Sequence, residues 1–149
     1  WKANVLKCSK NLAGLYSGLV MYESEYKAYP DKIGKPFWNR LRDPDEATWP
    51  DGVKAPLYGQ GGLYVCPAKG GKADLRDSTA TCHYRGPASP ISYALDDSAP
   101  IGADIEDNHD PKDKKKPINV LYYGGRVGEL KNDGSEEWTE LTGDTGVME

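Results

Sequence analysis

The sequence predicts an α+β fold in which one long N-terminal helix packs on a small antiparallel sheet with long loops. The first 29 residues carry an apolar stripe at helical spacing. Residues 118–123 form a β-branched and aromatic run that two glycines close. A chain of 149 residues suits one domain with a modest core. The expected parts of this single domain, residues 1–149, are the N-terminal helix (1–29), a Pro/Gly-rich connector (30–62), and strands and loops (63–149).

The apolar stripe of the helix alternates steps of four and three residues, which keeps its side chains on one face. Its members are Trp1, Val5, Cys8, Leu12, Leu15, Leu19, Tyr22, Tyr26 and Tyr29. Pro30 should end the helix near Tyr29, because proline disfavours the helical conformation of the residue before it. No capping side chain precedes Trp1, so we expect the helix to continue upstream. The stripe that we expect to pack on the sheet is Val5, Cys8, Leu12, Leu15, Leu19, Tyr22 and Tyr26.

Two glycines, Gly14 and Gly18, lie within this helix. Each costs about 1 kcal/mol relative to alanine in a helix interior, so the helix must depend on tertiary packing. We favour the interpretation that they are tolerated weak points. The alternative is that they allow a neighbouring segment to approach the helix backbone closely.

Three short elements are expected between the helix and the strongest strand. Residues 36–42 suit a short helix with Pro36 in its first turn. Residues 63–66, stopped by Pro67, suit a short strand, and residues 91–95 suit a second extended segment.

The strongest strand signal, residues 118–123, is followed by a hairpin turn at Gly124 and Gly125. Two glycines satisfy the positive φ values that a tight hairpin requires. Residues 126–130 should form the return strand, and residues 138–141 one further short strand before a Gly-rich tail.

Charge and hydropathy exclude several classes of partner. The net charge is −4, the isoelectric point is near 5.2 and the mean hydropathy is −0.72, which argues against a broad electrostatic grip on nucleic acid or anionic lipid. The basic cluster at residues 112–116 lies between prolines and suits a solvated loop. No run approaches the roughly 20 apolar residues of a membrane span, and the first residues are not a secretory signal.

Catalytic motifs are not found in the sequence. His83 and His109 have no partner at helical spacing, and no serine lies in a G-x-S-x-G turn. A triad of His109, Asp104 and a serine is conceivable, but residues that could meet in this way occur in almost any chain. A zinc site of Cys66, Cys82 and the two histidines lacks the usual ligand spacing. We therefore expect no enzyme, no catalytic residue and no cofactor-binding residue.

The three cysteines do not form a CxxC pair. Two alternatives stay open for Cys66 and Cys82: a disulfide that closes a small loop in an oxidising compartment, or two thiols. Cys8 belongs to the helix stripe, where it serves as a small hydrophobic residue.

A group of acidic residues is a candidate structural calcium site, because calcium prefers oxygen ligands gathered in a loop. The group lacks the regular spacing of a calcium-binding loop, and we favour a solvated acidic loop. Its members are Asp96, Asp97, Asp104, Glu106, Asp107 and Asp110.

The chain has ten tyrosines and four tryptophans but one phenylalanine. Amphipathic rings suit half-buried positions and contact surfaces. Trp38, Trp49, Tyr58 and Tyr64 therefore support an alternative function, a monomeric glycan- or peptide-binding module, although covering a small core is the simpler role. The stripe also permits a coiled-coil oligomerisation module, but tyrosines at its late positions favour packing on a sheet.

Several segments, in this order, are similar to the bacterial prepilin-like proteins, relatives of the pseudopilins of type II secretion. The segments are CSKNL at 8–12, LVMYESEYKAYP at 19–30, LYVCP at 63–67, SYAL at 92–95, PIGAD at 100–104 and, after His109, NVLYYGGRV at 119–127. Gly124 and Arg126 stand where the family pattern has Asp and a second His, so roles tied to those two residues do not transfer. The hairpin turn at this point of the family pattern does transfer to this chain.

The resemblance implies a pilin-like fold and a structural, non-catalytic function. Such proteins are made with a short leader ending in Gly, which a prepilin peptidase removes. An apolar N-terminal helix then anchors them in the inner membrane before they assemble outside the cytoplasm. We therefore expect a pilus- or pseudopilus-like filament subunit that self-assembles, with other pilin-like subunits, through a helical segment preceding Trp1. Membrane contact is expected only through that segment, and the resemblance adds weight to a structural calcium ion.

Overall fold

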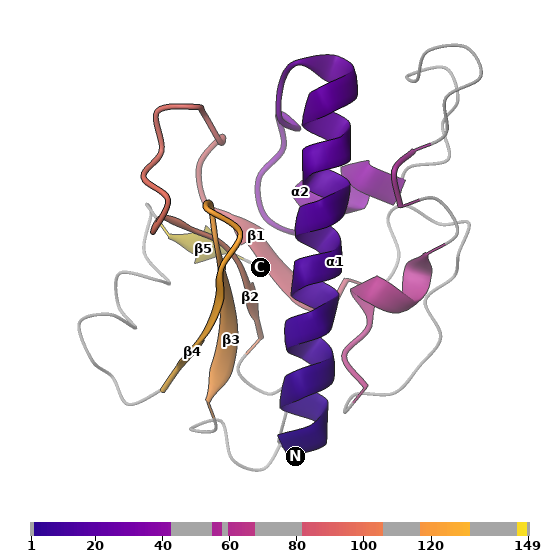
Figure 1. Cartoon of the computed structure of the whole chain (residues 1–149), viewed down its shortest axis with the longest axis vertical. Helices are drawn as coiled ribbons and strands as arrows, with labels where there is room; N and C mark the ends of the chain where they lie inside the picture. Colours follow the sequence, from indigo (N-terminus) through magenta and orange to yellow (C-terminus); the bar gives the residue numbers. More distant parts are fainter. Residues whose placement is uncertain are drawn as a thin grey trace.

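The computed structural model describes residues 2–42, 55–57, 60–67, 82–105, 117–131 and 146–148. Its long helix α1 lies across an antiparallel sheet whose strand order is β4-β3-β2-β1-β5 (Figure 1). The predicted α+β architecture is confirmed. The helices are α1 (Lys2–Tyr26), α2 (Lys35–Asn39), and the 3-10 helices η1 (Arg40–Arg42) and η3 (Gly61–Tyr64); the strands are β1 (Tyr84–Pro87), β2 (Pro100–Asp104), β3 (Ile118–Tyr122), β4 (Val127–Leu130) and β5 (Val147–Met148).

Helix α1 ends at Tyr26, three residues earlier than Pro30 suggests. Lys27 adopts a left-handed φ of 55°, and its N–H donates to the Glu23 carbonyl at 2.7 Å. This bond closes a left-handed C-terminal cap, which turns the chain away from the helix axis. Tyr29 therefore lies beyond the helix, although it still packs against the core.

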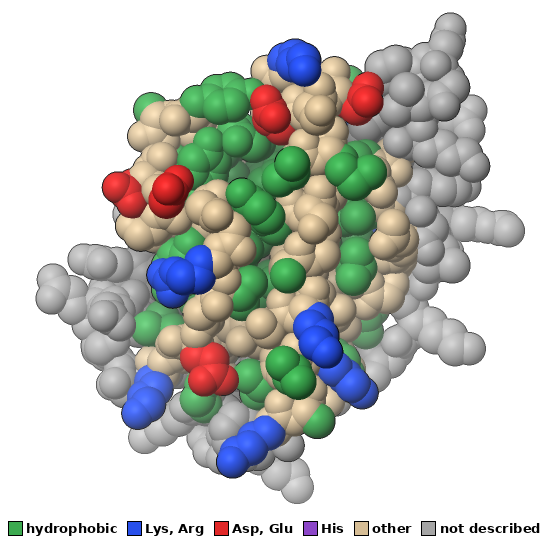
Figure 2. Space-filling model, in the orientation of Figure 1, with side chains coloured by type: hydrophobic (Ala, Val, Ile, Leu, Met, Phe, Trp, Pro, Cys, Tyr) green, Lys and Arg blue, Asp and Glu red, His purple; other side chains and the backbone are tan. Residues whose placement is uncertain are grey.

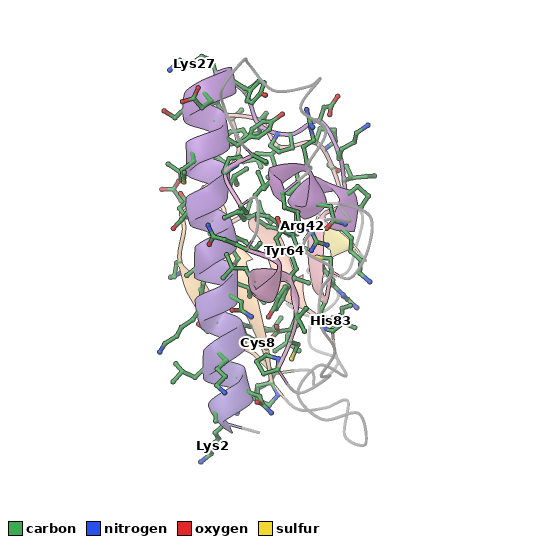
Figure 3. The ribbon with its side chains drawn as sticks, turned by 90° about the vertical axis from the view of Figure 1, so that its right-hand side faces the viewer. Lys2, Cys8, Lys27, Arg42, Tyr64 and His83 are labelled. Atoms are coloured by element: carbon green, nitrogen blue, oxygen red, sulfur yellow. The ribbon has the colours of Figure 1, made fainter. Side chains whose placement is uncertain are left out.

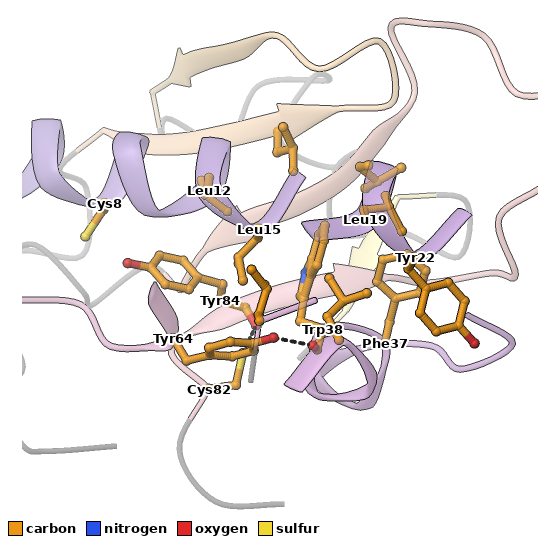
Figure 4. Packing of buried hydrophobic residues seen from close by; sticks show 14 of the residues in the cluster. Cys8, Leu12, Leu15, Leu19, Tyr22, Phe37, Trp38, Tyr64, Cys82 and Tyr84 are labelled. Carbon is orange, nitrogen blue, oxygen red and sulfur yellow. Dashed lines mark hydrogen bonds between the residues drawn. The ribbon is translucent and has the colours of Figure 1, made fainter. Parts of the chain in front are cut away.

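The predicted packing stripe is on the buried face of α1 (Figure 4). Cys8, Leu12 and Leu15 are completely buried, and Tyr26 packs on the core from a half-buried position. The main partner of this face in the sheet is β3. Trp1, the first member of the stripe, lies outside the described residues. The other buried stripe members are Val5, Leu19 and Tyr22.

Gly14 and Gly18 are contact sites, so the favoured interpretation of them as tolerated weak points was wrong. A Cβ at Gly18 would lie 2.6 Å from Leu57 Cγ, and a Cβ at Gly14 would lie 3.0 Å from Leu63 Cδ2. The connector thus lies directly on the helix backbone, which is the close approach considered as the alternative.

Gly18→Ala should destabilise the protein by up to about 2 kcal/mol. Alanine gains about 1 kcal/mol in helix propensity, but overpacking against buried Leu57 costs about 1–3 kcal/mol. Gly14→Ala is the matched control, because it meets only the tip of the half-buried Leu63 side chain and should be nearly neutral. Urea unfolding of both variants measures the difference. A Gly18→Ala protein more stable than wild type would contradict the close contact.

Short helices form at residues 35–42 and 61–64, although a strand was predicted at 63–66. The expected short helix at residues 36–42 is confirmed as α2 followed by η1, with a proline in the first turn. The expected strand at 63–66 is wrong, because η3 includes its first two residues and the other two belong to no strand. The expected strand at 91–95 is also wrong: Leu95 N–H donates to the Ser92 carbonyl in a turn.

The hairpin of β3 and β4 is confirmed, with Leu121 opposite Val127. Its turn differs from the expected one. Gly125 alone of the two glycines has a positive φ, 96°, and its N–H donates to the Tyr122 carbonyl at 2.8 Å. The turn therefore spans residues 123–125 and ends in a left-handed glycine, the usual geometry of a three-residue hairpin loop. Gly124 instead donates its N–H to the Asp97 carbonyl.

Strands β1, β2 and β5 were not predicted as strands. The expected strand at 138–141 lies outside the described residues.

Candidate functional site

The described acidic residues are not gathered into a metal site. Asp104 is completely buried in β2, where its Oδ2 accepts from the backbone N–H and the side-chain amide of Asn119 at 2.8 and 3.0 Å. Asp96 and Asp97 lie on an exposed turn. Within the described ranges, no group of three or more His, Cys, Asp or Glu residues could hold a metal ion. Glu106, Asp107 and Asp110 lie outside these ranges.

Asp96 has a local role in its turn. Its Oδ1 accepts from the Ser98 hydroxyl at 2.7 Å and from the Ser98 N–H at 2.9 Å. These two hydrogen bonds stabilise the charged carboxylate and lower the pKa of Asp96. The carboxylate therefore caps a turn of its own backbone.

The structure does not pair Cys66 with Cys82. All three cysteines are thiols, and Cys66 Sγ lies 3.0 Å from Cys8 Sγ. Cys82 Sγ donates instead to the Tyr84 carbonyl at 3.3 Å, and burial raises the pKa of the Cys82 thiol to about 11. The disulfide between Cys66 and Cys82 stays a prediction, and the described contacts of the two sulfurs favour other partners. Sequence proximity suggested that pair, whereas the fold brings Cys66 to the helix.

His83 is part of the framework. Its Nδ1 accepts the Cys66 N–H at 3.0 Å, and its own N–H donates to the Tyr64 carbonyl at 2.9 Å. These bonds join the end of η3 to the residue before β1. Nδ1 of His83 is thus occupied by a backbone contact, and His109 lies outside the described residues.

Two of the aromatic residues considered for ligand stacking lie in the core. Trp38 and Tyr64 are completely buried, and the Tyr64 hydroxyl donates to the Trp38 carbonyl at 2.6 Å (Figure 4). The Arg42 guanidinium lies 4.0 Å from the centre of the Tyr64 ring. These rings therefore cover the core, and the stacking role proposed for them was wrong. Trp49 and Tyr58 lie outside the described residues.

The outward face of α1 is the most unusual surface of the described chain. Leu6, Val20 and Met21 are 57%, 48% and 53% exposed. Between Lys10 and Glu23 the helix has no charged residue. Figure 2 accordingly shows hydrophobic and neutral atoms over the middle of the helix. We call the exposed uncharged residues Leu6, Ala13, Ser17, Val20 and Met21 the outer face of α1; exposed Lys10 lies between Leu6 and Ala13 on the same side of the helix.

A groove of about 470 Å³ adjoins this face near the helix N-terminus. Leu6 belongs to both surfaces, and β4, one of the two edge strands of the described sheet, forms the opposite wall. The lining residues are Lys2, Val5, Leu6, Ser9, Asn119, Val127, Gly128 and Glu129. The candidate site is therefore the surface made by one helix and one edge of the sheet.

Sequence analysis identified the buried stripe but missed the outer face. The available signal was the run NLAGLYSGLVMY at 11–22, which contains no charge. An amphipathic helix normally carries charged or polar side chains opposite its buried stripe.

None of the helices in the described part of the chain is both long and apolar enough to cross a membrane. No protein-family model, curated protein or solved structure matches the chain.

Proposed function

We propose that this chain is the pilin-like domain of a structural, non-catalytic subunit of an extracytoplasmic filament, of the pilus or pseudopilus type. The α+β architecture, with a single long N-terminal helix on an antiparallel sheet, supports this proposal. The ordered similarity of six segments to the bacterial prepilin-like proteins also supports it. The partners are copies of the same chain and other pilin-like subunits, and nucleic acid is not among them.

The observation that carries the proposal is the outer face of α1. Its middle exposes Ala13, Ser17, Val20 and Met21 and includes no charged side chain. Large exposed apolar side chains gain about 25 cal/mol for each Å² that a neighbouring helix covers. Small residues beside them let helices approach closely. Such a face suits side-by-side packing of helices in the core of a filament.

Assembly then needs no chemistry from this domain. The segment expected upstream of Trp1 anchors the subunit in the inner membrane and later enters the helix bundle. The outer face of α1 extends the bundle contact into the described domain, and the sheet and loops form the subunit surface away from it. A repeated contact generates an open filament when the outer face of one subunit meets a different surface of the next.

The test changes the outer face in the full-length protein, expressed in its own host. Val20→Glu and Met21→Glu should each reduce the amount of filament in the sheared cell-surface fraction at least about tenfold, since a tenfold loss needs only about 1.4 kcal/mol and burial of an unpaired charge costs more. Both sites are exposed, so the free energy of unfolding should change by less than about 0.5 kcal/mol.

Ile33→Glu is the matched control, because Ile33 is 40% exposed but lies outside α1. This variant should assemble as wild type does. Unchanged filament yield from the Val20 and Met21 variants would contradict the proposal that the outer face of α1 is a contact between subunits. A wild-type protein that enters no filament would overturn the proposed function itself.

The alternative, a monomeric glycan- or peptide-binding module, retains one observation in its favour. Tyr93 is 61% exposed, and its ring lies 5.0 Å from that of Tyr29, which contacts Tyr123 in turn. The gene upstream of the Trp1 codon distinguishes the two functions. A short leader ending in Gly before an apolar run supports the filament subunit, and a conventional signal peptide directly before Trp1 supports the binding module.

A further inference from the structure

Two cysteines that lie far apart in the sequence meet inside the fold. Cys8 Sγ and Cys66 Sγ are 3.0 Å apart, and both residues are completely buried. A disulfide has an S–S length of about 2.05 Å, so the two sulfurs need to approach by about 1 Å. Figure 3 shows Cys8 on the side of α1 that faces the rest of the domain.

The backbone around this pair is held by independent contacts. The Asn11 side-chain amide donates to the Val65 carbonyl at 3.1 Å, one residue before Cys66 and one helical turn after Cys8. The Cys66 N–H donates to His83 Nδ1. Leu63 packs on Gly14. The segment that carries Cys66 is therefore aligned on α1 without any contribution from the sulfurs.

Cys82 is not a competitor for either sulfur in the folded protein. It is 4% exposed, and its thiol donates to the Tyr84 carbonyl. The Cys82 sulfur is thus directed to the backbone of β1, whereas the Cys8 and Cys66 sulfurs contact one another.

We propose that Cys8 and Cys66 form a disulfide when the protein folds under oxidising conditions, and that this bond ties α1 to the segment after η3. The bond links positions 58 residues apart. It is independent of the proposed filament function, because it follows from the positions of the two sulfurs alone.

The reaction is an exchange with a small-molecule or protein disulfide of an oxidising compartment. One thiolate attacks the oxidant and forms a mixed disulfide, which releases the first reduced thiol. The second thiolate then attacks the protein sulfur of that mixed disulfide and releases the second. The two protein thiols lose two protons and two electrons, and the oxidant disulfide gains them as two thiols.

Burial of the two thiols should make disulfide formation slow once the protein has folded. The hydrogen bond to Cys66 and burial both raise the pKa of Cys8, which keeps its thiol protonated at neutral pH in the folded state. Because the thiolate is the reactive form, a protein folded under reducing conditions should oxidise slowly. Oxidation should be fastest while α1 is still docking.

Tryptic mapping of the wild-type chain tests the pairing directly. The protein is unfolded with reductant, refolded with oxidised and reduced glutathione, treated with N-ethylmaleimide and digested without reduction. Each cysteine falls on a different tryptic peptide: residues 8–10, 55–69 and 77–85. The expected product joins 8–10 to 55–69 and leaves 77–85 alkylated. A link that involves 77–85, or alkylation of all three peptides, would overturn the proposal.

Thermal unfolding with and without reductant gives a second readout. Reduction should lower the Tm of wild type and of Cys82→Ala by about 5–15 °C, the range expected for loss of a disulfide that closes a long loop. Cys8→Ala and Cys66→Ala should unfold at the same temperature with and without reductant. A reductant-sensitive Tm in Cys8→Ala, or its absence in Cys82→Ala, contradicts the assigned pair.

Discussion

Trp38→Ala should lower the free energy of unfolding by about 3–5 kcal/mol, the cost of removing a large aromatic side chain from a packed core. Trp38 is completely buried, and its indole N–H donates to the Arg85 carbonyl at 2.8 Å. Its ring packs edge-on against Phe37, with 4.8 Å between the centroids. A Cβ at Gly102 would lie 2.9 Å from the same indole. One side chain thus joins α2 to both β1 and β2.

Urea unfolding followed by far-UV circular dichroism measures this loss. Trp38→Phe separates its two parts, because phenylalanine keeps most of the apolar contact but leaves the Arg85 carbonyl without the indole donor. It should cost less than Trp38→Ala. Tyr93→Ala is the control for loss of an exposed ring and should cost less than about 1 kcal/mol. A Trp38→Ala protein within 1 kcal/mol of wild type would show that the indole does not join these elements.

The parts of the fold that sequence predicts are those with local signals. The stripe that includes Leu12 and Leu15 repeats at helical spacing, and Ile118–Tyr122 combines strand propensity with a glycine turn. The helix and the strand can each be predicted because the pattern that indicates it lies within a short stretch of sequence. The end of α1 is less predictable, because it depends on the left-handed backbone of Lys27, and lysine is not a residue that usually indicates such a cap.

The parts that sequence does not predict depend on distant partners. Strand β1 contains Gly86 and Pro87, which disfavour strands, and it forms because β2 and β5 pair with it on both sides. The opposite error occurs at Tyr64, where strand propensity is overridden. The backbone there makes 3-10 bonds, with the Val65 N–H donating to the Gly62 carbonyl, and the Tyr64 hydroxyl donates to the distant Trp38 carbonyl.

The outer face of α1 and the pair of Cys8 and Cys66 also depend on partners that are distant in the sequence. The run at 11–22 contains no charge, but the sheet and the segments that carry Leu57 and Leu63 together decide which of its residues face outward. Cys8 follows the pattern of a core residue, and nothing near it in the sequence points to Cys66 as its neighbour. That neighbour is defined by how η3 lies on α1.

Asn119→Ala should lower the free energy of unfolding by about 3 kcal/mol. The change removes the side-chain amide that donates to two buried acceptors, one of them a carboxylate. Asn119 is 2% exposed on β3, and its side-chain amide donates to Asp104 Oδ2 at 3.0 Å and to the Val5 carbonyl at 2.8 Å. This amide therefore joins β3 to both β2 and α1. Its loss leaves the completely buried Asp104 with one donor from residue 119, the backbone N–H.

A double-mutant cycle identifies the cause of that loss. If the cost comes mainly from a buried carboxylate deprived of the Asn119 amide, then Asp104→Ala combined with Asn119→Ala should be less destabilising than the sum of the single changes by at least 1 kcal/mol. Asn11→Ala is the matched control: this amide donates to the Val65 carbonyl and the Tyr84 hydroxyl, which are neutral acceptors, and its removal should cost only about 1 kcal/mol. Additive effects of the Asp104 and Asn119 changes would mean that the amide stabilises the fold through the Val5 carbonyl of α1, with Asp104 contributing separately.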